Sequence, residues 1–342
     1  MEAIILAGGF GTRLRPLTYT RAKSLLPICN TPMVSYLINM LPSDVTKVIL
    51  AANYRKDQIE NYFKENDSGK EIVVNGEPKP LGTGGAVKFA EKHITGTFLV
   101  LNSDIICSLN LDEMIRFHNK KNAFSTISLW PVKNVSEFGV VDIKKGGNVI
   151  GFVEKPKSEE APSNLINAGA YVLEPEVLDY IDTGRLVSME KEIFPRIIKD
   201  TGRFFGFRFD GFWIDVGRIS SYIDVHKFLM RNEELDNLMG NNCKVNGELR
   251  NSCIGNNVNI GKNTRLESTI VFDNTTIGDN VVLTHCVVGE NCNIENYSNI
   301  INTVVGDGET INEKTILENA LVWTKTVPRG YPDKQIGNVL RE

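Results

Sequence analysis

Residues 3–27 read AIILAGGFGTRLRPLTYTRAKSLLP, and the interpretation of the whole chain starts from this stretch. Its first five residues are apolar and predict a buried strand. The glycines that follow at 8, 9 and 11 allow a tight turn, and backbone N–H groups exposed after a parallel strand bind anions. Within 12 residues of Gly11 come four cations that repel one another, so we expect an anion of high charge, such as a triphosphate, to compensate Arg13, Arg15, Arg21 and Lys23.

The spacing of the glycines excludes two common phosphate loops. The dinucleotide fingerprint GxGxxG would need its third glycine at Arg13 or Leu14. The Walker loop needs a glycine directly before its lysine, whereas Ala22 precedes Lys23 here. A hydride-transfer enzyme and a P-loop ATPase are therefore both disfavoured.

Composition places the chain among ordinary globular proteins. Its 342 residues suggest two domains, with 42% hydrophobic and 23% charged residues. The net charge of −4 gives no general attraction for nucleic acid or anionic membranes, so neither is expected as a partner. The apolar runs are too short for a membrane span, and there is no secretory signal, so we expect a soluble, cytoplasmic protein with reduced cysteines.

Apolar segments alternate with helical patterns up to about residue 230. This alternation predicts an α/β fold with a Rossmann-like, mainly parallel sheet flanked by helices, in which ligands bind at the carboxyl ends of the strands. A hairpin is expected at 138–156, turning at Gly146-Gly147, and a closing helix at 219–231. The expected strands are 3–7, 46–52, 70–75, 97–101 and 124–130, and the expected helices are 32–41, 56–64, 85–92 and 111–121.

The periodicity changes after the acidic, Asn-rich segment at 232–242. Aliphatic residues now recur mostly every sixth position, which is typical of a left-handed β-helix of hexapeptide repeats. We expect roughly four coils and two domains, 1–232 and 233–342, the second comprising the β-helix with a tail. The residues predicted to point into the coil core are 254, 260, 266, 277, 283, 288, 294, 300, 305, 311 and 317.

LAGGFGTRLRPLT at 6–18 followed by KSLLP at 23–27 resembles the signature of the sugar-1-phosphate nucleotidylyltransferases. The resemblance covers nearly the whole chain, because many members also carry a carboxyl-terminal β-helix, and it is greatest to the mannose-1-phosphate guanylyltransferase and archaeal NDP-sugar synthase branch. The further matching motifs are EPKPLGTGGA at 77–86, LNSDII at 101–106, FGVV at 138–141, FVEKP at 152–156, NAGAYVL at 167–173 and FWIDVG at 212–217.

The resemblance implies a role for each matching residue. Arg13 and Lys23 would be catalytic, and Asp104 and Asp215 would hold Mg²⁺. Two groups of residues would bind the nucleotide. The first is Leu6, Ala7, Gly8, Gly9, Gly11 and Thr12. The second, around the base, is Gly82, Thr83, Gly84 and Gly85. The sugar phosphate would be bound by Gly139, Glu154, Lys155, Asn167 and Gly169. Independently, a carboxylate at the end of a strand suits a hard cation such as Mg²⁺.

The implied reaction is nucleotidyl transfer from a nucleoside triphosphate to a sugar 1-phosphate, giving an NDP-sugar and pyrophosphate. GTP with mannose 1-phosphate is the first expectation, and UTP or dTTP with glucose 1-phosphate is the alternative, since neither the base contacts at 77–86 nor the sugar contacts at 138–169 decide it. A noncatalytic homologue that senses an NDP-sugar is a second alternative. Ser24, Ser103 and Arg218-Ile219 depart from the family pattern and leave activity open.

The β-helix has two possible uses. Hexapeptide domains often use a histidine base for acyl transfer, and His285 is the only histidine in the repeats. The coils are too few, and their turns too short, to favour an acyl-CoA site. We therefore expect an assembly or regulatory surface and a homo-oligomer formed through the β-helix.

Overall fold

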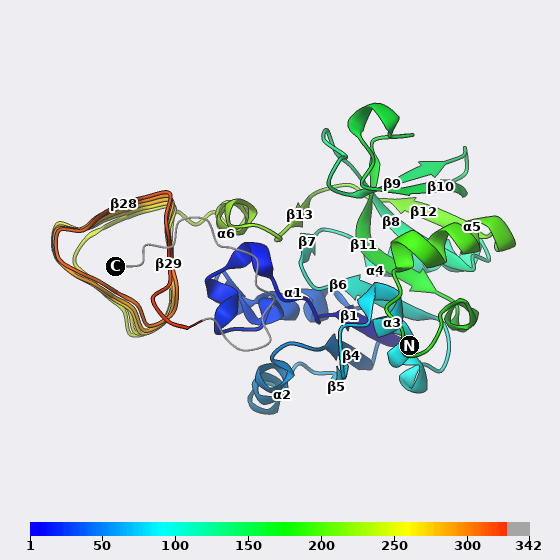
Figure 1. Cartoon of the computed structure of the whole chain (residues 1–342), viewed down its shortest axis with the longest axis horizontal. Coiled ribbons are helices and arrows are strands. Elements are labelled where there is room, and N and C mark those ends of the chain that lie inside the picture. Colours follow the sequence, from blue (N-terminus) through cyan, green and yellow to red (C-terminus); the bar gives the residue numbers. More distant parts are fainter. Residues whose placement is uncertain (327–342) are drawn as a thin grey trace. The chain divides into compact units, whose positions relative to one another are not determined.

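The structure is a computed structural model and describes residues 1–326; the predicted tail beyond lies outside the described residues. The chain divides into two compact units (Figure 1). The first comprises Met1–Gly9 and Val34–Ile214, and the second comprises Phe10–Met33 and the chain from Asp215 onward. The boundary between these compact units therefore differs from the domain boundary expected at residue 232, because residues 10–33 group with the carboxyl-terminal part of the chain.

The first unit is built on a mixed sheet whose central strands are parallel. Its strands are β1 (Glu2–Leu6), β4 (Lys47–Ala52), β5 (Glu71–Gly76), β6 (Phe98–Asn102), β8 (Ser125–Pro131), β9 (Gly139–Ile143), β10 (Val149–Glu154), β11 (Leu165–Leu173) and β12 (Phe204–Arg208). Their order is β10-β9-β11-β6-β1-β4-β5, with β8 pairing with both β11 and β12. Strand β1 runs parallel to β4 and β6, whereas β11 runs antiparallel to β6 and β8. The predicted α/β fold is confirmed.

Helices pack on this sheet and bury its aliphatic side chains. They are α1 (Met33–Met40), α2 (Lys56–Glu65), α3 (Gly82–Phe89), α4 (Leu111–Lys120) and α5 (Phe194–Thr201), with short helical turns at η4 (Glu91–His93), η5 (Ser158–Glu160), η6 (Pro175–Tyr180) and η7 (Met189–Ile193). Ile4, Val100 and Tyr171 are fully buried between them. Helix α3 begins three residues before the predicted position 85, because its glycines form the first turn rather than a loop.

The predicted hairpin is formed by β9 and β10. The two strands are antiparallel, and Gly146 and Gly147 between them have φ angles of +101° and +90°, which only glycine adopts readily. A separate two-stranded sheet joins β7 (Ile105–Cys107) and β13 (Trp213–Asp215). None of the helices in residues 1–326 is both long and apolar enough to cross a bilayer.

The second unit begins with the segment 10–33, which we call the signature segment. Helix α6 packs against it: the Tyr222 hydroxyl donates to the carbonyl of Pro27, and the backbone N–H of Cys29 donates to Nδ1 of His226 at 3.2 Å. This confirms the predicted closing helix. The elements are η1 (Thr12–Leu14), η2 (Leu17–Tyr19), η3 (Lys23–Leu25), β2 (Pro27–Ile28), β3 (Thr31–Pro32) and α6 (Ile219–Asn232).

The remaining chain winds into coils whose strands stack as three parallel sheets (Figure 1). The first is β14 (Leu238–Met239), β17 (Cys253–Ile254), β20 (Ile270–Val271), β23 (Val287–Val288), β26 (Val304–Val305) and β29 (Leu321–Val322). The second is β15 (Lys244–Val245), β18 (Asn259–Ile260), β21 (Thr276–Ile277), β24 (Asn293–Ile294) and β27 (Thr310–Ile311). The third is β16 (Glu248–Arg250), β19 (Arg265–Glu267), β22 (Val282–Thr284), β25 (Asn299–Ile301) and β28 (Ile316–Glu318).

This stacking is that of a left-handed β-helix, and the core matches the prediction. Each of the aliphatic residues expected to point inward is buried, from Ile254 at 0% exposed to Leu317 at 8%. The described residues form five complete coils, one more than expected. The sequence did not predict the first coil. Its inward residues Val245 and Leu249 are only partly buried, and the coil lacks the regular aliphatic–Gly pairs of the later coils.

Ser24 supplies a prediction about stability. It is fully buried in η3, and its hydroxyl has no hydrogen-bond partner among the described residues. Burying an unsatisfied hydroxyl costs on the order of 1 kcal/mol or more. Ser24→Ala should therefore raise the midpoint of urea-induced unfolding of the protein, followed by circular dichroism.

Ser252 is the matched control for this substitution. It is equally buried in the same unit, but its hydroxyl bonds to the Arg250 carbonyl at 2.9 Å and accepts from the Thr269 N–H at 3.2 Å. Ser252→Ala should lower the midpoint. Equal losses in the two variants would contradict our explanation of Ser24.

Candidate active site

The glycine turn leaves β1 at the carboxyl ends of the parallel strands. After Leu6, the Ala7 N–H still donates to the Ala51 carbonyl at 2.8 Å, so pairing continues one residue past the strand. A Cβ placed on Gly8 would lie 3.6 Å from the Ala51 oxygen and 3.7 Å from Oε1 of Glu77. Gly8 therefore lies beside both β4 and the stretch predicted to recognise the base.

The next predicted residues, Gly11, Thr12 and Lys23, lie together in the second unit. Gly11 has a φ of +62° and precedes η1, which begins at Thr12. The Thr18 hydroxyl donates to the Gly11 carbonyl at 2.9 Å. A Cβ on Gly11 would lie 3.2 Å from Cβ of Lys23, so the lysine side chain passes close over this glycine.

Arg13 and Asp215 meet at a glycine that was not singled out from the sequence. A Cβ placed on Gly217 would lie 2.6 Å from Nη2 of Arg13 and 2.7 Å from Oδ1 of Asp215. The predicted catalytic cation and the predicted metal ligand thus lie close together over Gly217, where a side chain would collide with both. The signal was present, because Gly217 ends the matching motif FWIDVG.

The expectation that one anion compensates all four cations of the signature segment was wrong for Arg21. Its guanidinium pairs with the carboxylates of Glu290 and Asp307 in the β-helix. Arg15 is only 6% exposed, and its guanidinium lies 5.4 Å from the centre of the Tyr19 ring. The cations that remain candidates for phosphate binding are Arg13 and Lys23.

Close packing accounts for much of the glycine pattern at 82–85. Gly82 has a φ of +73°, and a Cβ there would lie 2.5 Å from the Val187 carbonyl oxygen. The same oxygen accepts the N–H groups of Gly84 at 2.9 Å and Gly85 at 3.3 Å. The Thr83 hydroxyl donates to Oε2 of Glu190 at 2.7 Å. Their role around the base stays a prediction.

Asp104 occupies the short turn between β6 and β7. Gly169, with a φ of +83°, lies against this turn, since a Cβ there would be 2.9 Å from Nδ2 of Asn102. Oδ1 of Asn167 accepts the Gly169 N–H at 3.0 Å. Three predicted residues, Asp104, Asn167 and Gly169, are thus gathered in the first unit. Ser103 beside them is not among the described residues with positive φ, so its Cβ causes no backbone strain.

Glu154 and Gly139 face each other across the β9–β10 hairpin. They are register partners, and a Cβ on Gly139 would lie 2.9 Å from Oε2 of Glu154. Burial raises the pKa of the Glu154 carboxyl, and the neighbouring Lys155 ammonium, with Nζ at 3.7 Å, opposes that rise. The structure therefore brings together Gly139, Glu154 and Lys155.

Several polar residues around these positions were missed. Nδ2 of Asn167 donates to the hydroxyl of the fully buried Tyr171 at 2.7 Å. Burial raises the pKa of Tyr171, and the Glu190 carboxylate raises it further. Glu77 accepts the Leu81 N–H at 3.2 Å, and burial raises the pKa of its carboxyl. Glu77 opens the motif EPKPLGTGGA, whereas Glu190 lies outside all the matching motifs.

The predicted magnesium ligands are divided between the units, Asp104 in the first and Asp215 in the second. No group of three or more His, Cys, Asp or Glu side chains within residues 1–326 could hold a metal. Two carboxylates are a suitable donor set for Mg²⁺, which usually completes its shell with water and phosphate oxygens. Each carboxylate suits this ion by its chemistry, and their joint coordination of Mg²⁺ stays a prediction.

His285, considered for acyl transfer, lies at a corner of the β-helix. Its φ of +54° matches the values at Ser268 and Asn302, which precede and follow it by one coil. Its N–H donates to the Glu267 carbonyl at 2.9 Å. His285 thus occupies the corner position at which successive coils turn with a positive φ. This structural role gives the acyl-transfer alternative no support.

Comparisons with known proteins agree with this picture. Residues 2–232 match the family described as nucleotidyl transferase, and residues 236–336 match the GMPPB C-terminal domain. The chain is 40% identical over 230 residues to the mannose-1-phosphate guanyltransferase beta-B of Xenopus laevis, covering 65% of this chain and 63% of that protein. It is 43% identical over 231 residues to the probable mannose-1-phosphate guanylyltransferase 3 of Oryza sativa subsp. japonica, with the same coverage.

Among solved structures, a crystal structure of HddC from Yersinia pseudotuberculosis complexed with GMP-PN is similar. It has 29% sequence identity and a TM-score of 0.56, and the match covers 67% of this chain and 99% of that one. The matched part spans 63% of the length of the curated relatives. A family match over residues 2–232 covers well over half of the chain, so the protein belongs to the nucleotidyl transferase family.

Proposed function

We propose that this protein transfers a guanylyl group from GTP to mannose 1-phosphate, forming GDP-mannose and pyrophosphate. The observation that carries the proposal is the meeting of Arg13 and Asp215 at Gly217. It supplies a cation and a carboxylate at one point, in a chain whose relatives at 40% and 43% identity are named for this reaction. We further propose residues 1–232 as the catalytic domain and 233–342 as the β-helical domain.

The chemistry requires no general base. An oxygen of the sugar phosphate, already an anion at neutral pH, attacks the α-phosphorus of GTP. The bond from that phosphorus to the bridging oxygen breaks, and pyrophosphate leaves with the bonding electron pair. Catalysis is then positioning and charge neutralisation, in which Arg13 and Lys23 would contact the phosphates.

Asp104 and Asp215 would hold Mg²⁺ in this proposal. When bound, the ion neutralises phosphate charge and favours the approach of two anions. Lys155 would contact the sugar phosphate. The Glu154 carboxylate would accept hydrogen bonds from sugar hydroxyls, and the Asn167 amide would donate hydrogen bonds to them. At Gly139 and Gly169 a Cβ would lie 2.9 Å from Oε2 of Glu154 and 2.9 Å from Nδ2 of Asn102, so glycine lets these polar side chains pack closely there.

Glu77 offers a physical basis for choosing guanine. Its carboxylate lies beside Gly8 and accepts a hydrogen bond from the Leu81 N–H at 3.2 Å. Guanine presents two adjacent N–H donors on its Watson–Crick edge, which suit the paired oxygens of a carboxylate, whereas uracil and thymine present one. Partial burial of Glu77 strengthens such a bond.

The alternatives are separated by a substrate panel. Pyrophosphate release is measured with GTP, ATP, UTP and dTTP against mannose 1-phosphate and glucose 1-phosphate. We expect GTP with mannose 1-phosphate to give the highest kcat/KM. Preference for UTP or dTTP with glucose 1-phosphate would support that alternative, and nucleotide-sugar binding without any turnover would indicate a sensor.

Arg13→Ala should reduce kcat by at least about 100-fold, because one lost charge contact at a reacting phosphate removes roughly 3 kcal/mol of transition-state stabilisation. The measurement is pyrophosphate release at saturating substrates. Arg208→Ala, at an exposed position on β12, is the control and should retain full activity. Turnover of Arg13→Ala within tenfold of the wild type would reject the assignment.

Glu77→Gln should weaken discrimination between bases. The amide keeps one acceptor and replaces the other with a donor, so kcat/KM for GTP should fall by about tenfold or more relative to that for UTP. Glu71→Gln is the matched control, since that residue begins β5, the strand that ends just before Glu77, and forms an exposed ion pair with Lys47. An unchanged GTP-to-UTP ratio would contradict the role of Glu77.

A further inference from the structure

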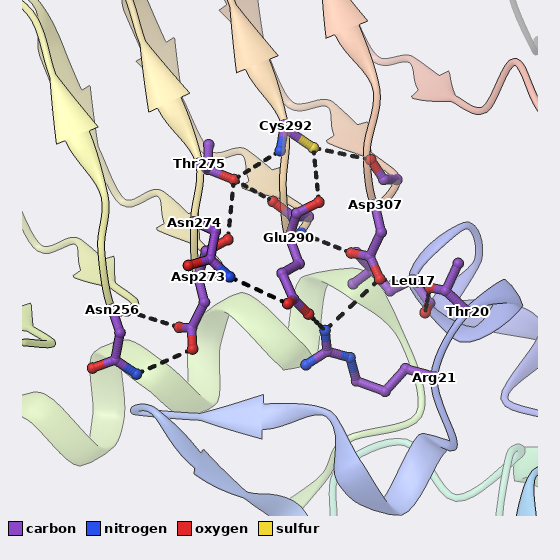
Figure 2. Close-up of polar contacts among 12 residues, drawn as sticks. Leu17, Thr20, Arg21, Asn256, Asp273, Asn274, Thr275, Glu290, Cys292 and Asp307 are labelled. Carbon is purple, nitrogen blue, oxygen red and sulfur yellow. Dashed lines mark hydrogen bonds and ion pairs between the residues drawn. The ribbon is translucent and has the colours of Figure 1, made fainter. Parts of the chain in front are cut away.

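One column of polar residues runs along the β-helix at the end of its first sheet. It contains one residue from each of four successive coils, Asn256, Asp273, Glu290 and Asp307 (Figure 2). Between the first two, Oδ1 of Asp273 accepts the Asn256 N–H at 2.8 Å and Oδ2 accepts the Asn256 side-chain amide at 3.1 Å. The asparagine thus satisfies both oxygens of the aspartate in the next coil.

The second pair departs from this pattern. Oδ1 of Asp307 accepts the Glu290 N–H at 2.7 Å, just as Asp273 accepts that of Asn256. Glu290, however, has a carboxylate where Asn256 has an amide, so it donates nothing to Oδ2 of Asp307. Two like charges therefore stand one above the other in adjoining coils, an arrangement that costs free energy unless a cation neutralises it.

The signature segment supplies the cation. Nη2 of Arg21 pairs with Oε2 of Glu290 and lies 3.8 Å from Oδ2 of Asp307, while the Thr20 hydroxyl donates to the same oxygen at 2.6 Å (Figure 2). The Arg21 guanidinium also lies 5.2 Å from the centre of the buried Phe272 ring. The side chains of Arg21, Glu290 and Asp307 are 22%, 32% and 15% exposed, so their charges are less screened than those of a surface pair.

Other contacts hold the same segment on the coils. The Tyr19 and Trp323 rings have centroids 5.2 Å apart, and the Asn30 amide donates to the Ile254 carbonyl at 2.8 Å. Arg21 differs from these in position. It lies two residues from Lys23 and eight from Arg13, the two cations to which the proposed function assigns phosphate contacts.

We propose that Arg21 is a positioning residue, and that its ion pairs with Glu290 and Asp307 let the β-helix set the affinity of the signature segment for nucleotide. The inference rests on the proposed function, because it takes Arg13 and Lys23 as the groups that meet the triphosphate. Breaking the pairs lowers the fraction of molecules in the binding-competent conformation. The apparent dissociation constant rises by the inverse of that fraction, whereas kcat at saturation changes little.

The decisive variant is Glu290→Asn. It gives Asp307 the same partner that Asn256 gives Asp273, while Arg21 loses its nearest carboxylate. The only coil contact removed with it is the weak one at 3.5 Å that Oε1 of Glu290 accepts from the Asn274 amide among the described residues. We expect an unchanged melting temperature, a KM for GTP about tenfold higher, and kcat within threefold of the wild type. Arg21→Ala should raise the KM similarly, and Arg21→Lys should recover part of the loss.

Two further measurements isolate the effect. Adding Arg21→Ala to Glu290→Asn should raise the KM by less than a further threefold, because the two residues act through one contact. Arg265→Ala is the matched control, since it breaks an exposed pair with Glu248 on the same β-helix and should leave the KM unchanged. A wild-type KM in Glu290→Asn, or independent tenfold effects of the two substitutions, would overturn the inference.

Failure of the proposed function is recognised separately. A wild-type protein that releases no pyrophosphate from any triphosphate would reject the function, and the inference is then judged from the dissociation constant for GTP measured by calorimetry. Equal constants for the wild type and Glu290→Asn would reject the inference as well, as would a wild type that does not bind GTP.

Discussion

The rest of the structure depends on the route of the chain after its first strand. β1 lies inside the sheet between β6 and β4, yet four residues past Leu6 the chain enters the second unit, and it returns to the first only at Val34. The signature segment is therefore held by partners near the other end of the sequence: Thr20 bonds to Asp307 across 287 residues. In the folded protein, the position of a segment near the start of the chain is therefore fixed in part by the last coils.

Features that depend on neighbouring residues were predictable. The inward aliphatic side chains of the coils, the strands β1 and β4 and the β9–β10 hairpin all follow from local periodicity or turn residues, and each lies where expected. The first coil was missed because its core positions are less apolar. The division of the signature segment from the sheet was not predictable, because it depends on contacts between residues more than 200 positions apart.

The same limit applies to the candidate site. Charge and proximity to Gly11 made Arg21 look like a phosphate ligand, and only the position of Glu290 and Asp307 shows where its charge is neutralised. Sequence motifs pointed to Arg13 and Asp215, but not to their meeting at Gly217. Self-association through the β-helix is a property of surfaces between chains and stays a prediction.

The glycines of the chain separate into two kinds once packing is known. At Gly82 and Gly85 a side chain would collide with neighbouring atoms at 2.5 Å and 2.8 Å, so these positions need glycine whatever binds nearby. Gly9 differs: a Cβ there would meet no described atom within 4 Å, and its φ is not among the positive values. Neither packing nor backbone conformation then requires a glycine at this point. The space beside its backbone is open, which suits the close approach of a group such as a phosphate, and the nucleotide contact expected of Gly9 stays a prediction.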